Sequence, residues 1–264
     1  MSTTHARPVT ETPVTNKEDA HAVVTEELSA FLKLLRGLEP SDWNKPTDCV
    51  AWSVRDVVAH VAGAFEDGAR ITVFIRHFTR AGKKHPDMNL IDAVNQMQLD
   101  ERGRHGPSAL IEELSVIGPK AISARRGRPQ LMRRRTVPSQ GTLPPGATFG
   151  YLFDVIYARD LWMHRIDIVN ATGTVLAVTD AETEIVEQVV RDLGEVWDGP
   201  TSTLTLTGHG AGSWQLGAGV PKAELSADAV ETCRMLSGRV ASPTITSTGD
   251  PRALQGLNSS RVIF

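Results

Sequence analysis

The chain has 264 residues, of which 41% are hydrophobic and 22% charged, and its formal net charge is −3. This composition is typical of a soluble globular protein of one or two domains, and the small negative charge argues against a general nucleic-acid binder. No apolar run approaches the about 20 residues that span a bilayer, and the N-terminal segment lacks the apolar region of a signal peptide. The two cysteines lie far apart in sequence, so no disulfide framework is expected and we predict a cytoplasmic protein.

The N-terminal third is predicted to contain a leader and two helices. Residues 1–15 are rich in Thr and Pro and are expected to be a disordered leader. Apolar residues recur at three- and four-residue steps from 16 to 38, which predicts a helix. A second helix is predicted to begin at Ser53, which forms a capping box with Asp56, and to continue towards Phe78.

The middle of the chain also has helical periodicity. Further helices are predicted over residues 90–102, 107–126, 149–171 and 179–197. Gly118 and Pro119 predict a break or kink in the second of these, and an Arg-rich and Pro/Gly-rich segment before the third predicts a loop. Long amphipathic helices of this kind favour an up-and-down bundle, which we assign to residues 16–199.

After residue 199 the pattern changes to short, partly alternating runs. Strands are predicted over residues 204–208, 213–217, 222–228 and 243–250. A Gly-rich turn joins the first two, and Asp228 is the predicted N-cap of a helix that ends before Gly238. The sequence therefore predicts a mainly α protein whose residues 200–264 form a small α+β domain.

Asp160 and His164 are the most informative pair of residues. Their four-residue spacing puts both on one face of a helix, and that face is otherwise apolar. A buried carboxylate is costly unless it is paired, hydrogen-bonded or coordinated to a cation. His60 occupies the apolar stripe of another helix, so the three side chains suit a zinc or ferrous site inside a bundle. Residue types alone leave open that Asp160 pairs with an arginine and that both histidines are structural.

Two motifs carry a resemblance to a known family. The segment P-T-D-C-V-A-W-S-V-R-D-V-V-A-H-V-A-G (46–63) and the segment R-D-L-W-M-H-R-I-D-I-V-N-A-T-G (159–173) are similar to signatures of the mycothiol-dependent maleylpyruvate isomerase family. This family is a branch of the DinB-like metal-binding four-helix bundles. The motifs L-T-L-T-G, W-Q-L-G and L-S-G-R resemble its small C-terminal domain, which is similar to sterol-carrier folds.

The resemblance implies a metal centre and a cosubstrate. It implies that His60, Asp160 and His164 hold a divalent metal, zinc by preference, and that mycothiol is the thiol cosubstrate. This chain has Asp160 where better-known members have Glu, which is longer by one methylene, so the geometry of that ligand is the point in question.

The function expected from this resemblance is a metal-dependent, mycothiol-using S-transferase or isomerase that acts on a small electrophile. The metal would activate the thiol as nucleophile. A metal-dependent hydrolase on the same bundle and a non-catalytic module that binds a small apolar ligand are the alternatives. Neither nucleic acid nor a membrane is expected as a partner, and the protein is expected to be a monomer or a dimer.

Several other residues have two interpretations. Arg239 is a candidate catalytic residue that holds an anionic substrate, or a cation at a helix C-terminus. Asp167 either hydrogen-bonds a ligand histidine or pairs with Arg165. Cys49 is interpreted as a small buried hydrophobe. The arginines of the segment 125–135 are interpreted as a solvated loop first, with anion attraction second. Core positions are expected for Trp43, Trp52, Trp162 and Trp197, and His209 has no evident partner.

Overall fold

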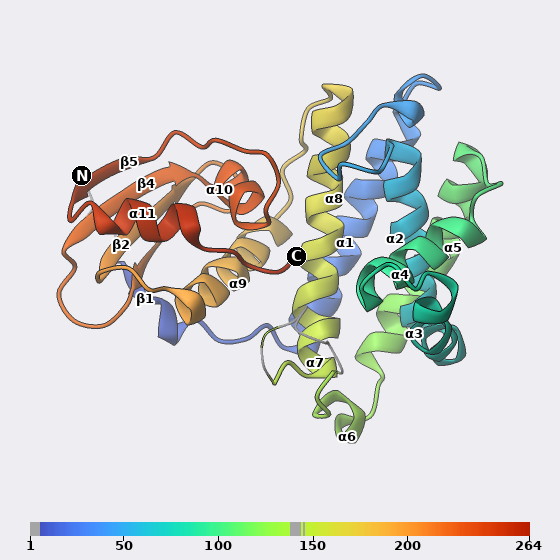
Figure 1. Cartoon of the computed structure of the whole chain (residues 1–264), viewed down its shortest axis with the longest axis horizontal. Coiled ribbons are helices and arrows are strands. Elements are labelled where there is room, and N and C mark those ends of the chain that lie inside the picture. Colours follow the sequence, from blue (N-terminus) through green and yellow to red (C-terminus); the bar gives the residue numbers. More distant parts are fainter. Residues whose placement is uncertain (1–5, 138–143, 145) are drawn as a thin grey trace. The chain divides into compact units, whose positions relative to one another are not determined.

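The computed structural model describes residues 6–137, 144 and 146–264, and it is mainly helical with one small sheet (Figure 1). This confirms the predicted fold class. The chain divides into two compact units, Asn16–Ala177 and Met1–Thr15 together with Val178–Phe264. No helix among the described residues has both the length and the apolar character needed to cross a bilayer.

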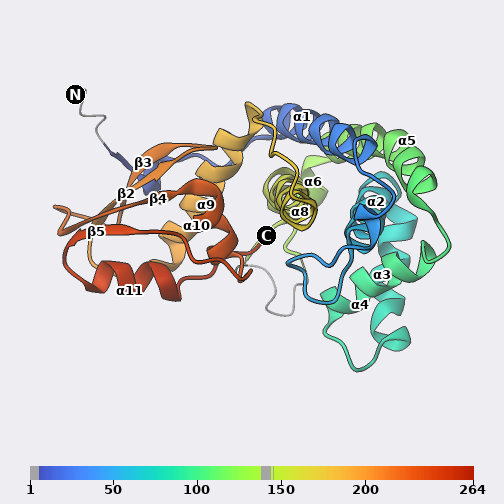
Figure 2. The same ribbon diagram turned by 90° about the horizontal axis from the view of Figure 1, so that it is seen from above.

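Four helices form the core of the first unit. They are α1 (Lys17–Arg36), α2 (Val54–Ala69), α5 (Pro107–Arg126) and α8 (Tyr157–Thr172). Helices α1 and α2 each contact both α5 and α8, so the four close into a bundle (Figure 2). Apolar side chains such as Phe31, Leu110 and Leu161 fill its interior. The predicted capping box of Ser53 and Asp56 is present at the start of α2.

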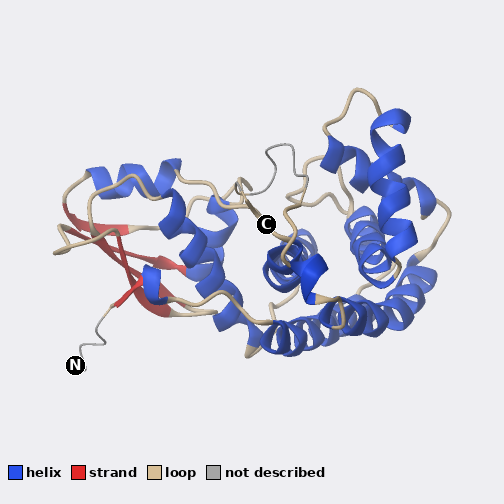
Figure 3. Cartoon of the chain, turned by 90° about the horizontal axis from the view of Figure 1, so that it is seen from below, coloured by secondary structure: helices blue, strands red, loops and turns tan. Residues whose placement is uncertain are grey.

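The single long helix predicted from Ser53 towards Phe78 is wrong, because the chain turns at Arg70. The backbone of Arg70 is extended, with φ −124° and ψ 98°, and it separates α2 from α3 (Ile71–Lys84). Helix α3 packs against α4 (Leu90–Glu101), and α4 packs back against α2. The two helices form a hairpin beside the bundle (Figure 3).

Of the break or kink predicted near Gly118 and Pro119, the break is absent. Helix α5 runs through Pro119, and Gly118 lies so close to Leu28 of α1 that a Cβ would clash with its side chain. Packing against α1 therefore outweighs the hydrogen bond that proline cannot donate.

The segment over residues 149–171, which was predicted as one helix, is not one regular helix. It comprises α7 (Phe149–Tyr151), a π-helical turn η3 (Leu152–Ile156) and then α8. Within η3, Asp154 is buried and forms an ion pair with Arg133 of the short helix α6 (Gln130–Arg133). A π turn adds one residue to a helical turn and is often found at functional sites.

The second unit is a five-stranded sheet with helices. Its strands are β1 (Arg7–Pro8), β2 (Ser202–Thr207), β3 (Gly212–Leu216), β4 (Ala223–Asp228) and β5 (Thr246–Gly249). The order is β1-β3-β2-β4-β5, with β2 antiparallel to β3 and parallel to β4. Buried and more exposed residues alternate along β2 and β4, as expected of strands with one covered face. The helices are α9 (Ala181–Val196), α10 (Ala229–Leu236), α11 (Arg252–Ser259) and the short 3₁₀ turn η1 (Val9–Glu11).

The N-terminal segment belongs to this second unit. The prediction of a disordered leader is wrong for the described residues 6–15, because β1 pairs with β3 and Val9 is buried against Gly194 of α9. Helix α9 also lies in this unit, whereas our boundary near residue 199 assigned it to the bundle. The helix α11 was not predicted.

Candidate metal centre

The three candidate ligands lie together at one place in the bundle. His60 comes from α2, while Asp160 and His164 come from successive turns of α8. Asp160 Oδ1 lies 3.6 Å from His60 Nε2 and 3.3 Å from His164 Nε2. The two imidazole rings are nearly perpendicular, with centroids 5.1 Å apart. One nitrogen of each histidine and one carboxylate oxygen therefore point at a common centre.

These separations suit a tetrahedral metal ion. Metal–ligand bonds of about 2.0–2.1 Å at tetrahedral angles place ligand atoms about 3.4 Å apart. The ligand atoms of the three residues all lie within 4.8 Å of one another. Two imidazoles and one carboxylate leave a fourth position for a water, a thiol or a substrate. The residues present therefore fit a divalent metal of the zinc type.

His164 has a hydrogen-bonding partner on its other ring nitrogen. Asp167 Oδ2 lies 2.9 Å from His164 Nδ1, and Asp167 is fully buried. Arg165 instead makes a two-pronged ion pair with Glu27 of α1. Of the two interpretations of Asp167, the structure therefore shows the contact with His164.

His60 is held in a corresponding way by an amide. Its Nδ1 lies 2.8 Å from Gln98 Oε1 of α4, and Gln98 Nε2 donates to Asp67 Oδ2 at 2.7 Å. All three side chains are buried. Sequence reasoning missed Gln98, because the hairpin that brings it to the site follows from the unpredicted turn at Arg70.

One side of the site is aromatic and partly open. Trp52, in the segment before α2, lies with its ring 4.9 Å from that of His60 and 6.0 Å from that of His164. It was expected in the core, but it is only partly buried and faces the imidazoles. The side chain of Asp160 is 22% exposed, whereas those of the histidines are 7% and 6% exposed. Access from solvent is therefore on the side of Asp160.

The charges around the site favour the ionised form of Asp160 and the protonated form of His164. Burial alone raises the pKa of Asp160, but the charge and hydrogen bond of His164, and then those of His60, hold it well below its ordinary value. Burial alone lowers the pKa of His164, but Asp160, Asp167 and Cys49 raise it well above its ordinary value. The pocket thus attracts a positive charge, and a divalent cation would displace the proton of His164.

Two arginines of the segment 125–135 are buried, so the expectation of a solvated loop is wrong for them. Arg125 of α5 lies 3.5 Å from the ring centroid of Tyr157 and donates to the carbonyl oxygen of Ala64 at 2.8 Å. Gly68 leaves the space for its guanidinium. Arg133 is buried against Asp154. Tyr157 lies one turn before Asp160 on α8. The guanidinium of Arg125, which packs on Tyr157, therefore adds positive charge close to the helix that carries Asp160.

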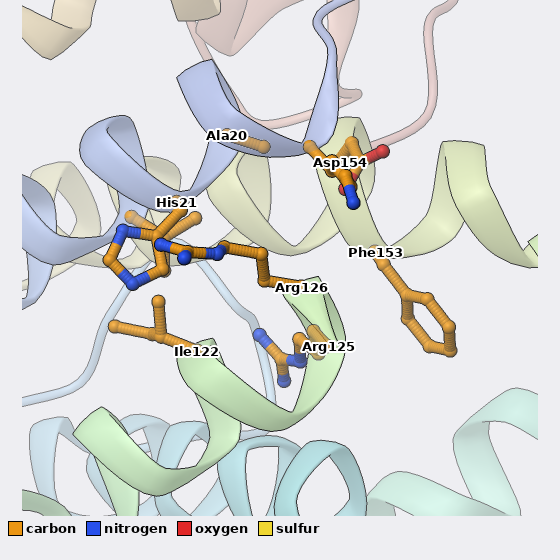
Figure 4. Close-up of a pocket in the computed structure, with 9 residues that line it drawn as sticks. Ala20, His21, Ile122, Arg125, Arg126, Phe153 and Asp154 are labelled. Atoms are coloured by element: carbon orange, nitrogen blue, oxygen red, sulfur yellow. The ribbon is translucent and has the colours of Figure 1, made fainter. Parts of the chain in front are cut away.

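Arg125 also lines a small pocket. It is bordered by Ala20 and His21 of α1, Ile122 of α5 and Phe153 of η3 (Figure 4). Its cavity volume is about 10 Å³, which is about the space of one water molecule. It therefore cannot hold a thiol cosubstrate or an electrophile.

The remaining candidates are distributed over both units. Cys49 is not an isolated hydrophobe: its Sγ lies 3.4 Å from Asp167 Oδ2 and 4.0 Å from His164 Nδ1. Arg239 follows α10 in the second unit, and its catalytic role stays a prediction. His209, in the turn after β2, pairs with Glu182 of α9 at 2.6 Å, which sequence reasoning missed. Trp43 and Trp162 are buried as expected, whereas Trp197 is only partly buried.

Comparison with known proteins identifies a family and a fold. The family described as the mycothiol maleylpyruvate isomerase N-terminal domain matches residues 24–169. No curated protein matches the chain. The crystal structure of the mycothiol-dependent maleylpyruvate isomerase matches with a TM-score of 0.58 and 15% identity, covering 93% of this chain and 98% of that one. A mutant of the same enzyme matches with a TM-score of 0.58, 16% identity and the same coverage. Both structures therefore share this fold.

Proposed function

The chain belongs to the family of the mycothiol maleylpyruvate isomerase N-terminal domain, and from this premise we propose that it is a metal-dependent enzyme that uses mycothiol. The proposed activity is S-transfer to a small electrophile, or its isomerisation, in the cytoplasm. The observation that carries the proposal is the convergence of His60, Asp160 and His164, whose candidate ligand atoms all lie within 4.8 Å of one another. The structural match to a mycothiol-dependent maleylpyruvate isomerase over nearly the whole chain supports it.

The three ligands have distinct tasks in this proposal. His60 and His164 supply neutral nitrogens, and Asp160 supplies the negative charge that makes a divalent cation favourable in a buried place. When bound, the metal lowers the pKa of a coordinated thiol, which is about 8.5 in the free state, so that a thiolate is available at neutral pH. Asp167 keeps His164 in the tautomer whose Nε2 is free for the ligand role.

The thiolate then has two possible reactions with an electrophile. It adds to an activated double bond, which permits rotation about the resulting single bond before the thiol leaves again, and the product is an isomer. Alternatively it displaces a leaving group and stays attached through a new C–S bond. Trp52 covers one side of the histidines, and a covered site limits competing attack by water.

The test begins with the metal. Elemental analysis of the purified protein is expected to give about one zinc per chain, as one three-ligand site requires, and loss of mycothiol is then followed against a panel of electrophiles. His60→Ala leaves two of the three ligands, so the variant should lose its zinc during purification and consume no thiol, although it keeps a weak affinity for added zinc. His105→Ala is the matched control, because His105 is 43% exposed and pairs with Glu113 away from the site. A fully active His60→Ala protein would falsify the proposal.

Omitting the thiol separates this function from the other enzyme class. A metal-dependent hydrolase would turn over its substrate without mycothiol. The proposed enzyme requires mycothiol, which is consumed at every turnover in S-transfer and is released again in isomerisation. Unchanged turnover after omission of the thiol would therefore refute mycothiol dependence and leave the metal site in place.

A further inference from the structure

We propose that Gln98 is a positioning residue that holds His60 in the tautomer and orientation needed for metal ligation. This inference rests on the proposed metal site and adds a residue from a different part of the chain. It also gives the hairpin of α3 and α4 a function, because Gln98 is its contribution to the site.

The direction of each hydrogen bond fixes the tautomer of His60. Asp67 is a carboxylate that only accepts, so the amide of Gln98 must turn its NH₂ group to Asp67 and its oxygen to His60. That oxygen also only accepts, so His60 must carry its proton on Nδ1. The lone pair is then on Nε2, the atom that lies 3.6 Å from Asp160 Oδ1. The amide therefore selects the ligand form of the imidazole.

Asp67 itself contacts a buried histidine. His77 Nδ1 lies 2.7 Å from Asp67 Oδ1, and His77 Nε2 lies 3.2 Å from Glu101 Oε2. His77 is completely buried, and Asp67 is 3% exposed. The contacts therefore run in series from His60 through Gln98 and Asp67 to His77.

The backbone of α2 is shaped to admit this amide. Gly63 lies one turn after His60, and a Cβ at this position would lie 2.5 Å from Gln98 Cβ and 2.6 Å from its Cγ. Any side chain at position 63 would therefore displace Gln98. A glycine costs helix stability relative to alanine, so its presence here is explained by the space that it leaves.

The two ligand histidines thus have different supports. His164 is oriented by the carboxylate of Asp167 on its own helix, whereas His60 is oriented by a neutral amide from α4. Partners of this kind raise metal affinity by about 10–100-fold in other proteins. We expect an effect in this range for Gln98, because nothing else in the described part of the chain bonds His60 Nδ1.

The experiment measures zinc affinity rather than activity. Apoprotein is titrated with zinc against a chromophoric chelator at pH 7, for the wild type, Gln98→Met and Gly63→Ala. Both variants should bind zinc about 10–100-fold more weakly than the wild type. Gly82→Ala in α3 is the control, since a Cβ there meets nothing within 4 Å, and its affinity should be unchanged. Wild-type affinity in Gln98→Met would overturn the inference.

A double-mutant cycle separates positioning from general destabilisation. In a His60→Ala background, Gln98→Met should have no further effect on the remaining zinc affinity, because its target is gone. An equal loss in both backgrounds would indicate a merely structural role and refute the inference.

A measurement on the wild type does not depend on variants that fold. Nitrogen-15 NMR of the zinc-loaded protein should show His60 protonated on Nδ1 and coordinated through Nε2. Coordination through Nδ1 would overturn the positioning role alone. A wild type that binds no zinc would overturn the role and the proposed metal site together, whereas tight zinc binding without thiol consumption would overturn only the activity.

Discussion

The two compact units differ in what they bury. The sheet unit buries mainly apolar side chains from alternate strand positions, and the charged residues buried there are Glu182 and Asp192. The bundle unit buries many more charged or titratable side chains: Glu27, His60, Asp67, His77, Arg102, Arg125, Arg133, Asp154, Arg159, His164, Arg165 and Asp167. Buried ion pairs are weak evidence for stability, because desolvation offsets much of their attraction. Buried charge is therefore concentrated in the unit that carries the candidate metal centre.

The largest effect is expected from breaking a buried ion pair of the bundle. Glu27→Ala removes the buried carboxylate that accepts two hydrogen bonds from the guanidinium of Arg165, a side chain that is 1% exposed. The free energy of unfolding should fall by about 3–5 kcal/mol, measured by urea denaturation. The double variant Glu27→Met with Arg165→Met should recover most of this loss, since a packed apolar pair carries no desolvation cost.

The exposed pair of Lys84 and Asp100 supplies the control for that experiment. Both side chains are well exposed, at 48% and 32%, so Lys84→Ala should change the free energy of unfolding by less than about 1 kcal/mol. Equal losses in Glu27→Ala and Lys84→Ala would remove the distinction between buried and surface charges.

A somewhat smaller effect is expected from the sheet unit, where apolar burial dominates. Leu225 of β4 is 1% exposed, and Leu225→Ala should lower the free energy of unfolding by about 2–5 kcal/mol through lost burial and a residual cavity. Its neighbour Glu224 faces the other side of the strand and is exposed. Glu224→Ala should therefore stay within about 0.5 kcal/mol. A similar loss of unfolding free energy in both variants would contradict the assignment of one buried and one exposed face to β4.

The smallest effect is expected from pH, because the protonation of His77 makes the stability of the bundle depend on it. Burial alone lowers the pKa of His77, but Asp67 and then Glu101 raise it above its usual 6.5. A raised pKa in the folded state means that the stabilisation is complete below pH about 6.5 and is lost as the pH rises through the folded-state pKa.

The corresponding measurement is thermal melting of apoprotein from pH 6 to pH 9. His77→Gln should lose more stability at pH 6 than at pH 9, and its melting temperature should fall less over this range than that of the wild type. A wild-type melting temperature that rises through this window in parallel with the variant's would contradict the assignment of the charge to His77.

Local patterns predicted many of the regular elements. The helix from 16 to 38, the hairpin strands around the Gly-rich turn and the helix capped by Asp228 match α1, β2 with β3, and α10. In each case the signal is short-range: apolar periodicity, a turn or a cap. The strand β1 was missed because two residues are too few for an alternating pattern, and only its pairing with β3 makes it a strand.

The three candidate ligands could be named from the sequence, whereas the residues around them could not. The i, i+4 spacing identifies Asp160 and His164 as neighbours, and the structure places His60 beside them. Gln98 and Trp52 reach the site through the turn at Arg70 and through the segment before α2, and neither has a periodic signal. Asp160 Oδ1 lies 3.6 Å from His60 Nε2 and 3.3 Å from His164 Nε2, so this side chain reaches both imidazoles although it is shorter than Glu by one methylene.

The π turn at Leu152–Ile156 lies between α7 and α8, which follow each other without a break in the helical backbone. One extra residue in a turn rotates everything on its N-terminal side by about 100° relative to a regular α-helix. The direction in which Asp154 points towards Arg133 is therefore set independently of the direction in which Asp160 and His164 point from α8. Gain or loss of one amino acid in the π turn would rotate the residues of α7 and η3 about the helix axis. Asp160 and His164 would keep their four-residue spacing, because both lie on the regular helix α8.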